Sequence, residues 1–445
     1  MQQPDTPSSG VASGGAAPPA PASLCVKCHL HEATLDSRSQ RVCSDCFTKF
    51  ISAKCIKQVG IIGKDIRNPG TGAASQKKKY LLGLSLGVSS SVLVHLLNEN
   101  VEYQLAKGRN APFDLVIVHV DSSGLYPSSS SPGSVQETLE GYRKRYPRFE
   151  FRLVPLSAVL DLDTVDWRTL ILPSSAVTPP ENEQQLHALF FDRLSSPTSR
   201  ADILRLFTRH LLISSARTES CHALLLGHTT TALAELTLAE TAKGRGFSLP
   251  WQVNDGPVAV VSHSTAVPTE PITTTTTPTS QSSNATTTTT ESQIQVYHPL
   301  RDLLRKELVI YATELMGTPS LASDLNIMIP NHPSSATQQA AAAVVSHKDL
   351  SIEEVMFRYF AEVEENYPSV VANVARTTGK LVRLLGGDSE PATGSHSSCG
   401  MCTMPLDEQG DERWRGELGD EDVEDDMTRS SAGRICYGCE RSIRG

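Results

Sequence analysis

Eight of the ten cysteines stand in four Cys-x-x-Cys pairs. The pairs are Cys25 with Cys28, Cys43 with Cys46, Cys399 with Cys402, and Cys436 with Cys439. Fourteen residues separate the first two pairs, and thirty-three separate the last two. Each such turn aims two thiolates at one point, about 3.7 Å apart, which is the edge of a tetrahedron with ~2.3 Å metal–sulfur bonds. Two turns complete a four-thiolate site, so the spacing predicts two structural zinc modules.

Disulfides and a redox dithiol are the alternative uses of these pairs. The first 22 residues are mostly Ala, Pro, Ser and Gly, without the apolar run of a secretory signal. We therefore expect an intracellular, reducing compartment, which disfavours disulfides. A redox motif needs one pair beside a helix start rather than four pairs in two sets. Whether each metal is zinc or iron stays open. Of the two remaining thiols, Cys221 is expected to be buried and Cys55 to be a bystander rather than a fifth ligand.

Two glycine-containing turns could approach an anion. Gly87 lies in the stretch LSLGVSSSVLVHLL at 84–97, where an apolar run gives way to a helical pattern. A glycine there lets the backbone come close to a phosphate, and the helix start beyond Ser89 offers free N–H groups. The second turn begins at Gly227 and His228, after another apolar run, and also opens a helix.

Short apolar runs must position these turns. Residues 80–84, 114–120, 149–156 and 222–226 are expected to be buried strands, with helical patterns between them. This alternation predicts an α/β fold whose parallel sheet is covered on both faces. Further on, residues 304–315 and 352–363 each show an apolar helical stripe that we expect to pack on the core. Ser351 with Glu354 predicts a capping box at the start of the second of these helices.

The length of 445 residues favours two or three folded units. The expected segments are a disordered tail at 1–22, an N-terminal zinc module at 23–60, the α/β domain at 77–320 with a flexible Thr/Ser-rich insert at 262–293, a linker and helical segment at 321–385, and a C-terminal zinc module with an acidic loop at 386–445.

The net charge of −9 is unevenly spread. Residues 407–426 carry eleven acidic residues against two arginines, so the rest of the chain is close to neutral. Residues 41–80 carry nine basic residues against two aspartates. Such a basic segment serves either phosphate backbones or only as a solvated linker. No stretch is long and apolar enough to span a bilayer, so we expect a soluble protein.

The two turns resemble the two signatures of the PP-loop ATPase fold, S-G-G-x-D-S and G-H-N-x-D-D-x-A-E. The positions that agree are Ser85, Gly87, Ser90, Gly227, His228, Ala234 and Glu235. The positions that differ are Leu86, in place of a glycine, Ser89, in place of an aspartate, and Thr229, Thr231 and Ala232, in place of the Asn and both Asp residues. In that fold the first loop holds the ATP pyrophosphate and its Asp helps to place the metal.

Other motifs narrow the resemblance. Ser196-Pro197-Thr198-Ser199-Arg200-Ala201-Asp202 precedes a helical pattern, Lys243-Gly244-Arg245-Gly246 follows the second signature, and His298-Pro299-Leu300 leads into a helix with Glu307. With cysteine modules at both ends, residues 24–320 and the final module resemble the cytoplasmic tRNA 2-thiolation protein 2 family. Its members are the second, degenerate PP-loop subunit of the eukaryotic wobble-uridine thiolase.

This resemblance implies a cytoplasmic heterodimer with a catalytic PP-loop subunit that binds ATP and Mg²⁺. The implied reaction is 2-thiolation of the wobble uridine of tRNA Lys, Gln and Glu, with sulfur from a thiocarboxylated ubiquitin-like carrier and no role for a membrane. The active subunit uses three cysteines of its central domain, whereas 77–320 contains only Cys221. We therefore assign no catalytic residue here. The expected remnant of a nucleotide loop is Ser85, Gly87, Ser89, Ser90, Gly227 and His228.

Two other functions stay open. The chain could be an ATP-dependent tRNA sulfurtransferase in its own right, binding ATP through loop amides with Ser85, Ser89 and Ser90 as ligands. It could also be a zinc-ribbon interaction protein unrelated to RNA, with the α/β domain as a scaffold.

Overall fold

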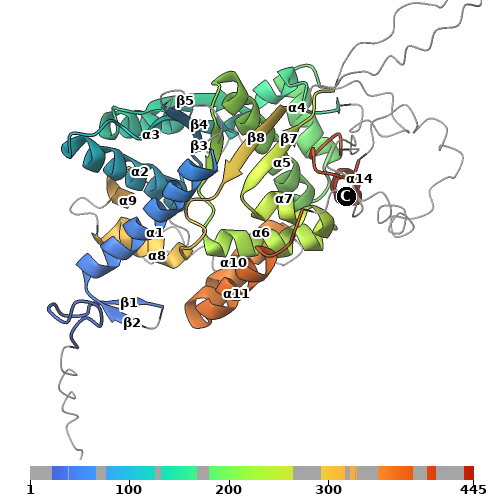
Figure 1. Cartoon of the computed structure of the whole chain (residues 1–445). Coiled ribbons are helices and arrows are strands. Elements are labelled where there is room, and N and C mark those ends of the chain that lie inside the picture. Colours follow the sequence, from blue (N-terminus) through green and yellow to red (C-terminus); the bar gives the residue numbers. More distant parts are fainter. Residues whose placement is uncertain are drawn as a thin grey trace, which may run out of the picture. The chain divides into compact units, whose positions relative to one another are not determined.

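The computed structural model describes residues 23–38, 40–66, 77–125, 132–167, 180–263, 292–315, 321–325, 327, 349–383, 398–406 and 435–444 (Figure 1). The chain divides into two compact units, Met1–Phe50 and Ile51–Gly445. The predicted tail at 1–22, most of the Thr/Ser-rich insert and the acidic loop lie outside the described residues. The segment boundaries expected from the sequence stay predictions.

The first unit contains a two-stranded antiparallel sheet, β1 (Leu35–Ser37) and β2 (Gln40–Val42), in which Leu35 pairs with Val42. Helix α1 (Ser44–Asp65) begins directly after the second strand and continues into the second unit. The turn before β1 carries Cys25 and Cys28, while Cys43 and Cys46 lie at the start of α1. This arrangement lets a short segment bring both cysteine pairs together.

The second unit is built on a six-stranded sheet in the order β5-β4-β3-β6-β8-β7. The strands are β3 (Lys78–Gly83), β4 (Phe113–Asp121), β5 (Glu150–Pro155), β6 (Ala223–Leu226), β7 (Gly256–Val260) and β8 (Ser292–Tyr297). All neighbouring pairs are parallel except β7 with β8. The predicted α/β fold and its four predicted strands are confirmed, with ends that differ by one or two residues.

The sequence analysis missed β7 and β8. They lie on either side of the Thr/Ser-rich insert, and β8 begins at Ser292. Strand β8 alternates buried and partly exposed positions instead of forming one apolar run, as befits its place next to the edge. The sheet is therefore mixed, because β7 adds an antiparallel edge strand.

Helices lie around this sheet (Figure 1). They are α2 (Val88–Ala106), α3 (Pro132–Arg145), α4 (Glu183–Ala188), α5 (Pro197–Thr218), α6 (Thr230–Ala242), α7 (Leu249–Val253), α8 (Arg305–Ile310), α9 (Leu321–Asp324), α10 (Ile352–Asn366), α11 (Pro368–Thr378) and α14 (Tyr437–Arg444). Among the described helices, none has the length and apolar character needed to cross a membrane.

The apolar stripe of α10 is only partly buried. Phe360 is 1% exposed, but Tyr359, which we expected on the same packed face, is 49% exposed. Half of the predicted capping box is confirmed, because the Ser351 side chain accepts a hydrogen bond from the Glu354 N–H at 3.1 Å. The Glu354 carboxylate accepts from Arg358 Nη2 at 2.8 Å. The motif that starts at Ser196 does not precede a helix, since α5 already begins at Pro197.

The C-terminal cysteine turns are part of the main core. Cys399, Met401 and Met404 pack in the same hydrophobic cluster as Leu81 of β3 and Phe207 of α5. The carbonyl of Gly400 accepts a hydrogen bond from the Asp166 N–H at 2.9 Å. The turn from Cys399 to Cys402 is therefore held by the second unit, and Cys439 of the last pair belongs to the same cluster.

A buried ionic cluster fixes this arrangement. The carboxylate of Asp202, on α5, has no exposed side-chain surface and accepts from Lys243 Nζ at 2.7 Å, Arg245 Nη1 at 2.9 Å and Ser442 Oγ at 2.7 Å. Burial raises the pKa of Asp202, but the neighbouring cations, Arg245 foremost, hold it far below its ordinary value. Two motifs singled out in the sequence, around Asp202 and around Arg245, thus meet in space.

Replacing Asp202 by Asn should destabilise the second unit by about 3–5 kcal/mol, because two buried cations lose their charge partner. The free energy of unfolding in urea measures this loss. The matched control is Asp192→Asn, an exposed aspartate, which should change stability by no more than about 0.5 kcal/mol. Equal unfolding midpoints for the two variants would contradict the role given to the cluster.

His210 of α5 is buried between two partners. Its Nδ1 lies 2.9 Å from Thr164 Oγ1, and its Nε2 lies 2.7 Å from the carbonyl oxygen of Met401. A neutral ring satisfies both, because Nε2–H donates to the carbonyl and Nδ1 accepts from the hydroxyl. Burial lowers the pKa of His210 from 6.5 to about 4.

The unfolded state therefore binds a proton at His210 more readily than the folded state between about pH 6.5 and pH 4, so stability falls as the pH falls through this window. From pH 7 to pH 5 this residue should remove about 2 kcal/mol of unfolding free energy. His210→Gln should flatten that pH dependence, whereas the exposed-site control His222→Gln should leave it unchanged. Parallel pH profiles for wild type and His210→Gln would refute the assignment.

Candidate functional site

A cavity of about 520 Å³ lies beyond the carboxyl ends of β3, β4 and β6. Its wall includes Ser85, Ser89 and Ser90 from the first turn and Gly227 and His228 from the second. Strand β3 stands between β4 and β6, so the strand order reverses at this place. Open α/β sheets bind ligands in the crevice at such a reversal. Gly87, the sixth predicted residue of the loop, does not line the cavity.

The first turn contains one residue in the left-handed conformation. Leu86, which stands where the PP-loop signature has a glycine, has a φ of 61°. This left-handed conformation costs a non-glycine residue about 1–2 kcal/mol. Gly87 then caps α2 in an extended conformation, and its carbonyl accepts from Ser90 Oγ at 3.1 Å and Ser91 Oγ at 2.8 Å.

The polar side chains of the first turn are serine hydroxyls and carry no charge. Ser85 Oγ and Ser90 Oγ lie 3.0 Å apart, and Ser90 Oγ also accepts from the Ser85 N–H at 3.2 Å. Ser89 occupies the position of the signature aspartate. The described residues that line the cavity include no Asp, Glu or Cys. The wall therefore offers no carboxylate for Mg²⁺ and no thiolate for sulfur transfer.

The second turn touches the first through Gly227. A Cβ atom added there would lie 3.0 Å from Ser90 Cα and 3.1 Å from Ser90 N, so a side chain would push the two turns apart. The threonines that replace the Asn and Asp of the signature have structural partners instead. Thr229 caps α6 by accepting from the Ala232 N–H at 3.1 Å, and Thr231 Oγ1 donates to Glu364 at 2.8 Å.

His228 and Glu235 agree with the signature, but neither is poised for chemistry. Burial lowers the pKa of His228 to about 3, and the nearby His298, at a ring separation of 5.2 Å, adds to this effect. The imidazole is therefore neutral at physiological pH. The Glu235 carboxylate forms an ion pair with Arg305, at 2.6 Å to Nη1.

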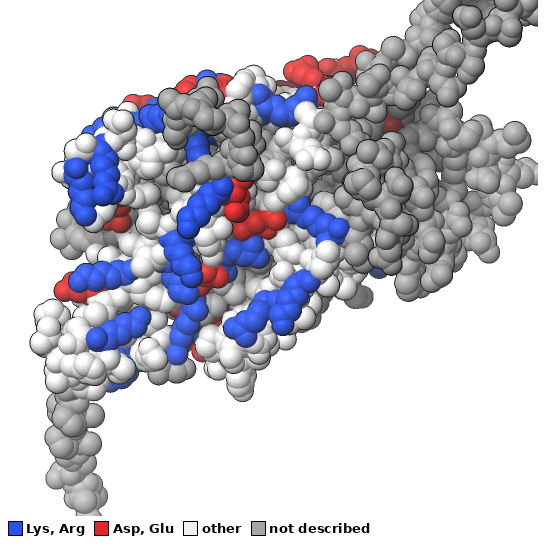
Figure 2. Space-filling view, viewed as in Figure 1, with Lys and Arg blue, Asp and Glu red and all other residues white. Residues whose placement is uncertain are grey.

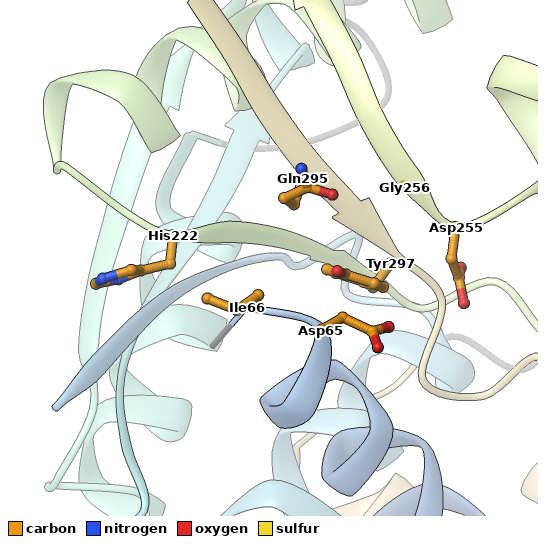
Figure 3. Close-up of a pocket in the computed structure, with 7 residues that line it drawn as sticks. All are labelled: Asp65, Ile66, His222, Asp255, Gly256, Gln295 and Tyr297. Carbon is orange, nitrogen blue, oxygen red and sulfur yellow. The ribbon is translucent and has the colours of Figure 1, made fainter. Parts of the chain in front are cut away.

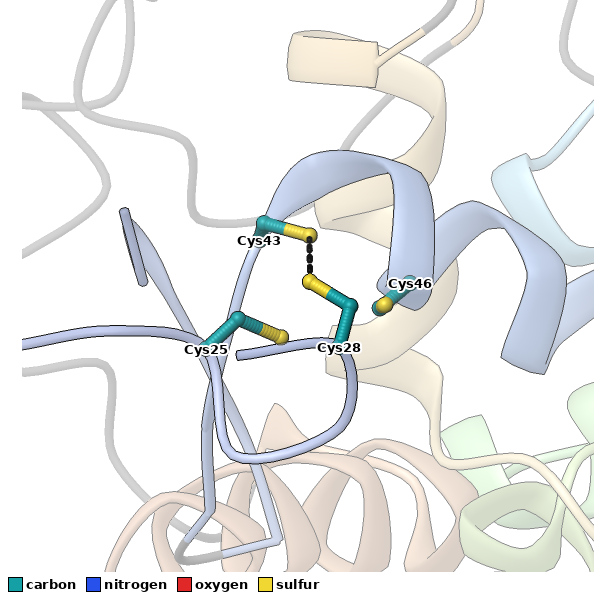
Figure 4. Close-up of side chains that lie close together, drawn as sticks. All are labelled: Cys25, Cys28, Cys43 and Cys46. Atoms are coloured by element: carbon teal, nitrogen blue, oxygen red, sulfur yellow. Dashed lines mark hydrogen bonds between the residues drawn. The ribbon is translucent and has the colours of Figure 1, made fainter. Parts of the chain in front are cut away.

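The four N-terminal cysteines converge within the first unit (Figure 4). Their sulfur atoms all lie within 4.8 Å of one another, and Cys28 Sγ is 3.8 Å from Cys43 Sγ. That separation is close to the edge of about 3.7 Å expected for a tetrahedral four-thiolate site. Although burial raises the pKa of Cys25, backbone N–H groups of Cys28, Cys43 and Lys27 lower it to about 6. The donor set thus fits a metal ion.

The four C-terminal cysteines form a second group of the same size, with Cys402 Sγ 3.9 Å from Cys436 Sγ. Two donors point at its sulfurs. The Cys436 N–H donates to Cys399 Sγ at 3.3 Å, and Arg245 Nη2 donates to Cys439 Sγ at 3.4 Å. Such outer hydrogen bonds orient and stabilise metal-bound thiolates. All ten cysteines are free of disulfides, and both remaining thiols, Cys55 and Cys221, are buried as expected for Cys221.

A second cavity, of about 490 Å³, lies between the end of α1 and the strands β6 and β8 (Figure 3). Two carboxylates, Asp65 and Asp255, line it. Asp255 is engaged with His298 Nδ1 at 2.9 Å and with Arg301 Nη1 at 2.8 Å. His222 Nδ1 accepts from the Lys79 N–H at 3.1 Å. Since Asp255 and His222 already have partners within the protein, this cavity is a weaker candidate site than the first.

The sequence analysis missed three cationic or titratable residues of the first cavity, Arg205, Arg209 and His119. Arg205 and Arg209 are four residues apart on α5, so they share one face of that helix. The available signal is a pair of basic residues at helical spacing among the apolar residues of this helix.

The family model and the sequence relatives that match this chain carry the same family description. A family model described as cytoplasmic tRNA 2-thiolation protein 2 matches residues 351–441. The protein of that name from Phaeosphaeria nodorum is 34% identical over 94% of both chains, and that from Sclerotinia sclerotiorum is 33% identical over 80% of this chain and 81% of its own. Among solved structures, the U34-tRNA thiolase NcsA from Methanococcus maripaludis, solved with its [4Fe-4S] cluster, is a distant likeness, with 14% identity, a TM-score of 0.47 and coverage of 86% and 92%. On the strength of its sequence relatives, the chain belongs to the cytoplasmic tRNA 2-thiolation protein 2 family.

Proposed function

We propose that this chain is the non-catalytic subunit of a cytoplasmic heterodimeric tRNA thiolase, required for 2-thiolation of the wobble uridine of tRNA Lys, Gln and Glu. One observation carries the proposal: the cavity keeps the two turns of a PP-loop but has neither carboxylate nor thiolate among its described lining residues. The family membership supplies the reaction.

Exchange of the uridine C2 oxygen for sulfur has three chemical requirements. ATP must activate the oxygen, Mg²⁺ must neutralise phosphate charge, and a thiolate or thiocarboxylate must deliver sulfur. The first cavity of this chain lacks groups for the last two. The chemistry therefore belongs to a PP-loop partner subunit that binds ATP and Mg²⁺ and receives sulfur from a thiocarboxylated ubiquitin-like carrier.

The role that we assign to this chain is to bind tRNA and the catalytic partner subunit. Figure 2 shows lysine and arginine side chains gathered on the face where α1 lies. In the second unit, Lys57 and Lys64 of α1 and Lys77 before β3 are exposed. These residues belong to the basic segment at 41–80, and contact with tRNA phosphates is the use we assign to them.

Cells that lack this chain should lose 2-thiouridine from the three tRNAs, because the partner then lacks its docking surface. Mass spectrometry of tRNA nucleosides measures the loss. Complementation with Lys57→Glu and Lys64→Glu together should restore less thiolation than wild type, whereas Lys107→Glu, an exposed lysine outside the basic segment, should restore it fully. Unchanged 2-thiouridine after deletion, or thiolation by the purified chain alone, would overturn the proposal.

We further propose that each four-cysteine group holds one structural Zn²⁺. The four N-terminal ligands would be Cys25, Cys28, Cys43 and Cys46, and the C-terminal ones Cys399, Cys402, Cys436 and Cys439. Bound zinc would fix the thiolates and contribute folding energy. No chemical step is assigned to either ion.

Cys28→Ser and Cys399→Ser should each remove one metal ion per chain, as measured by elemental analysis. Only Cys399→Ser should also lower the thermal midpoint of the second unit, because Cys399 packs in its main core. Removal of both metals with a chelator should reproduce the larger shift. Iron in place of zinc would refute the metal assignment, and equal midpoints for the two variants would refute the structural distinction.

A further inference from the structure

We propose that a third cavity, between α1 and α2, holds one unpaired nucleotide of the bound RNA, with its phosphate on lysine side chains and its base among side-chain amides. This inference rests on the tRNA contact proposed above for α1 and makes it specific, because it predicts that the chain distinguishes single-stranded from double-stranded RNA. It uses neither of the two turns that resemble the PP-loop signatures.

The third cavity has a volume of about 870 Å³, within the range of small-ligand sites. Lys78 and Phe113, the first residues of the parallel strands β3 and β4, line it. The first cavity lies beyond the carboxyl ends of the same strands, so the two cavities lie at opposite ends of the strands. All lining residues of the third cavity belong to the second unit.

Two glycines of α1 leave room for this cavity. Gly60 and Gly63 share one helix face with Val59 and Lys64, because residues three or four apart lie on the same side of a helix. Glycine is a poor helix former, so helix stability does not account for two of them within one turn. A Cβ atom added at Gly60 would meet no atom within 4 Å, and one added at Gly63 would lie 3.5 Å from Lys78 Nζ. A side chain at Gly60 would therefore extend into the cavity.

Lysines give the third cavity a positive charge. Lys64, Lys77 and Lys78 line it, and its described lining residues include no Asp or Glu. Lys78 is held against α1, because its Nζ donates to the carbonyl oxygen of Gly63. Lys77 Nζ lies 2.5 Å from Asp114 Oδ1, which offsets one of the three charges. The exposed Lys64 forms no ion pair with a described residue, so its ammonium group is available to a phosphate.

The other walls suit a nucleobase. Tyr80 and Phe113, with ring centroids 5.4 Å apart, and Val59 provide an apolar surface. Asn100 and Asn110 line the cavity with side-chain amides that form no hydrogen bond to a described residue. An amide offers a donor and an acceptor side by side, as the pairing edge of a base does. In a duplex those edges are paired and the base faces are stacked, so only an unpaired nucleotide can use both features.

The test is fluorescence anisotropy of the full-length chain with a labelled single-stranded RNA of about ten nucleotides and with a blunt RNA duplex of the same length. Gly60→Leu fills the cavity, and Ala53→Leu, at an exposed position of the same helix, is the matched control. We expect about tenfold weaker binding of the single strand by Gly60→Leu, unchanged binding of the duplex, and no change with Ala53→Leu. Lys57→Glu, outside the cavity, should weaken both RNAs alike, because it removes only a phosphate contact.

A second variant keeps the result interpretable if the leucine side chain displaces α1. Asn100→Ala loses no hydrogen bond within the described protein, so it should keep the thermal midpoint of wild type and bind the single strand several-fold more weakly. A free nucleotide has the same chemistry as the proposed ligand, and AMP is therefore added as a competitor. We expect AMP to displace the RNA only in large excess. Displacement by AMP at concentrations equal to those of the RNA would identify a site for free nucleotides and overturn the RNA assignment.

Other outcomes separate this inference from the proposed subunit role. No binding of the single strand by wild type, unchanged binding by Gly60→Leu and Asn100→Ala, or equal losses on single strand and duplex would each overturn the nucleotide site. If these results appear while deletion of the chain still removes 2-thiouridine, the inference fails and the subunit role stands. If the binding results are as expected but deletion leaves 2-thiouridine unchanged, the subunit role fails and the nucleotide site stands.

Discussion

The second unit depends on the burial of the Asp202 carboxylate among cations. Asp202, Glu240 and Glu353 balance Arg205, Lys243 and Arg245, with Lys243 Nζ 2.6 Å from Glu240 and 2.5 Å from Glu353. The members come from α5, from the end of α6 and from α10, and Ser442 of α14 adds a hydrogen bond. Buried charges are tolerated only as a complete set, because each one left alone costs several kcal/mol. Segments more than two hundred residues apart in the chain must therefore assemble together.

Helix α5 contacts both the first cavity and the C-terminal cysteine group. One face of α5 gives Arg205 and Arg209 to the cavity, while His210 holds the carbonyl of Met401 between two cysteines of the C-terminal group. Arg245, which neutralises Asp202, also donates to Cys439. The C-terminal cysteine group is thus packed into the α/β unit and linked to it by hydrogen bonds. A shift of α5 would therefore change the positions of the cavity wall and of the C-terminal cysteine turn together.

Local patterns in the sequence predicted much of this structure. Continuous apolar runs located β3 to β6, and cysteine spacing located both four-thiolate groups, because these features depend on neighbouring residues only. The structure places five of the six predicted loop residues around one cavity. Other features depend on distant segments and could not be foreseen: the pairing of β7 with β8 and the contact of Asp202 with Arg245. The positive φ of Leu86 was hidden because leucine itself gives no sign of it.

The edge strands have a practical consequence. Val260 at the end of β7 pairs directly with Ser292 at the start of β8, so the intervening stretch leaves and re-enters the sheet at adjacent points. A connector between adjacent points can have almost any length, since loop-closure entropy grows only slowly with the number of residues. The pairing of these two edge strands therefore places little constraint on the number of residues between them.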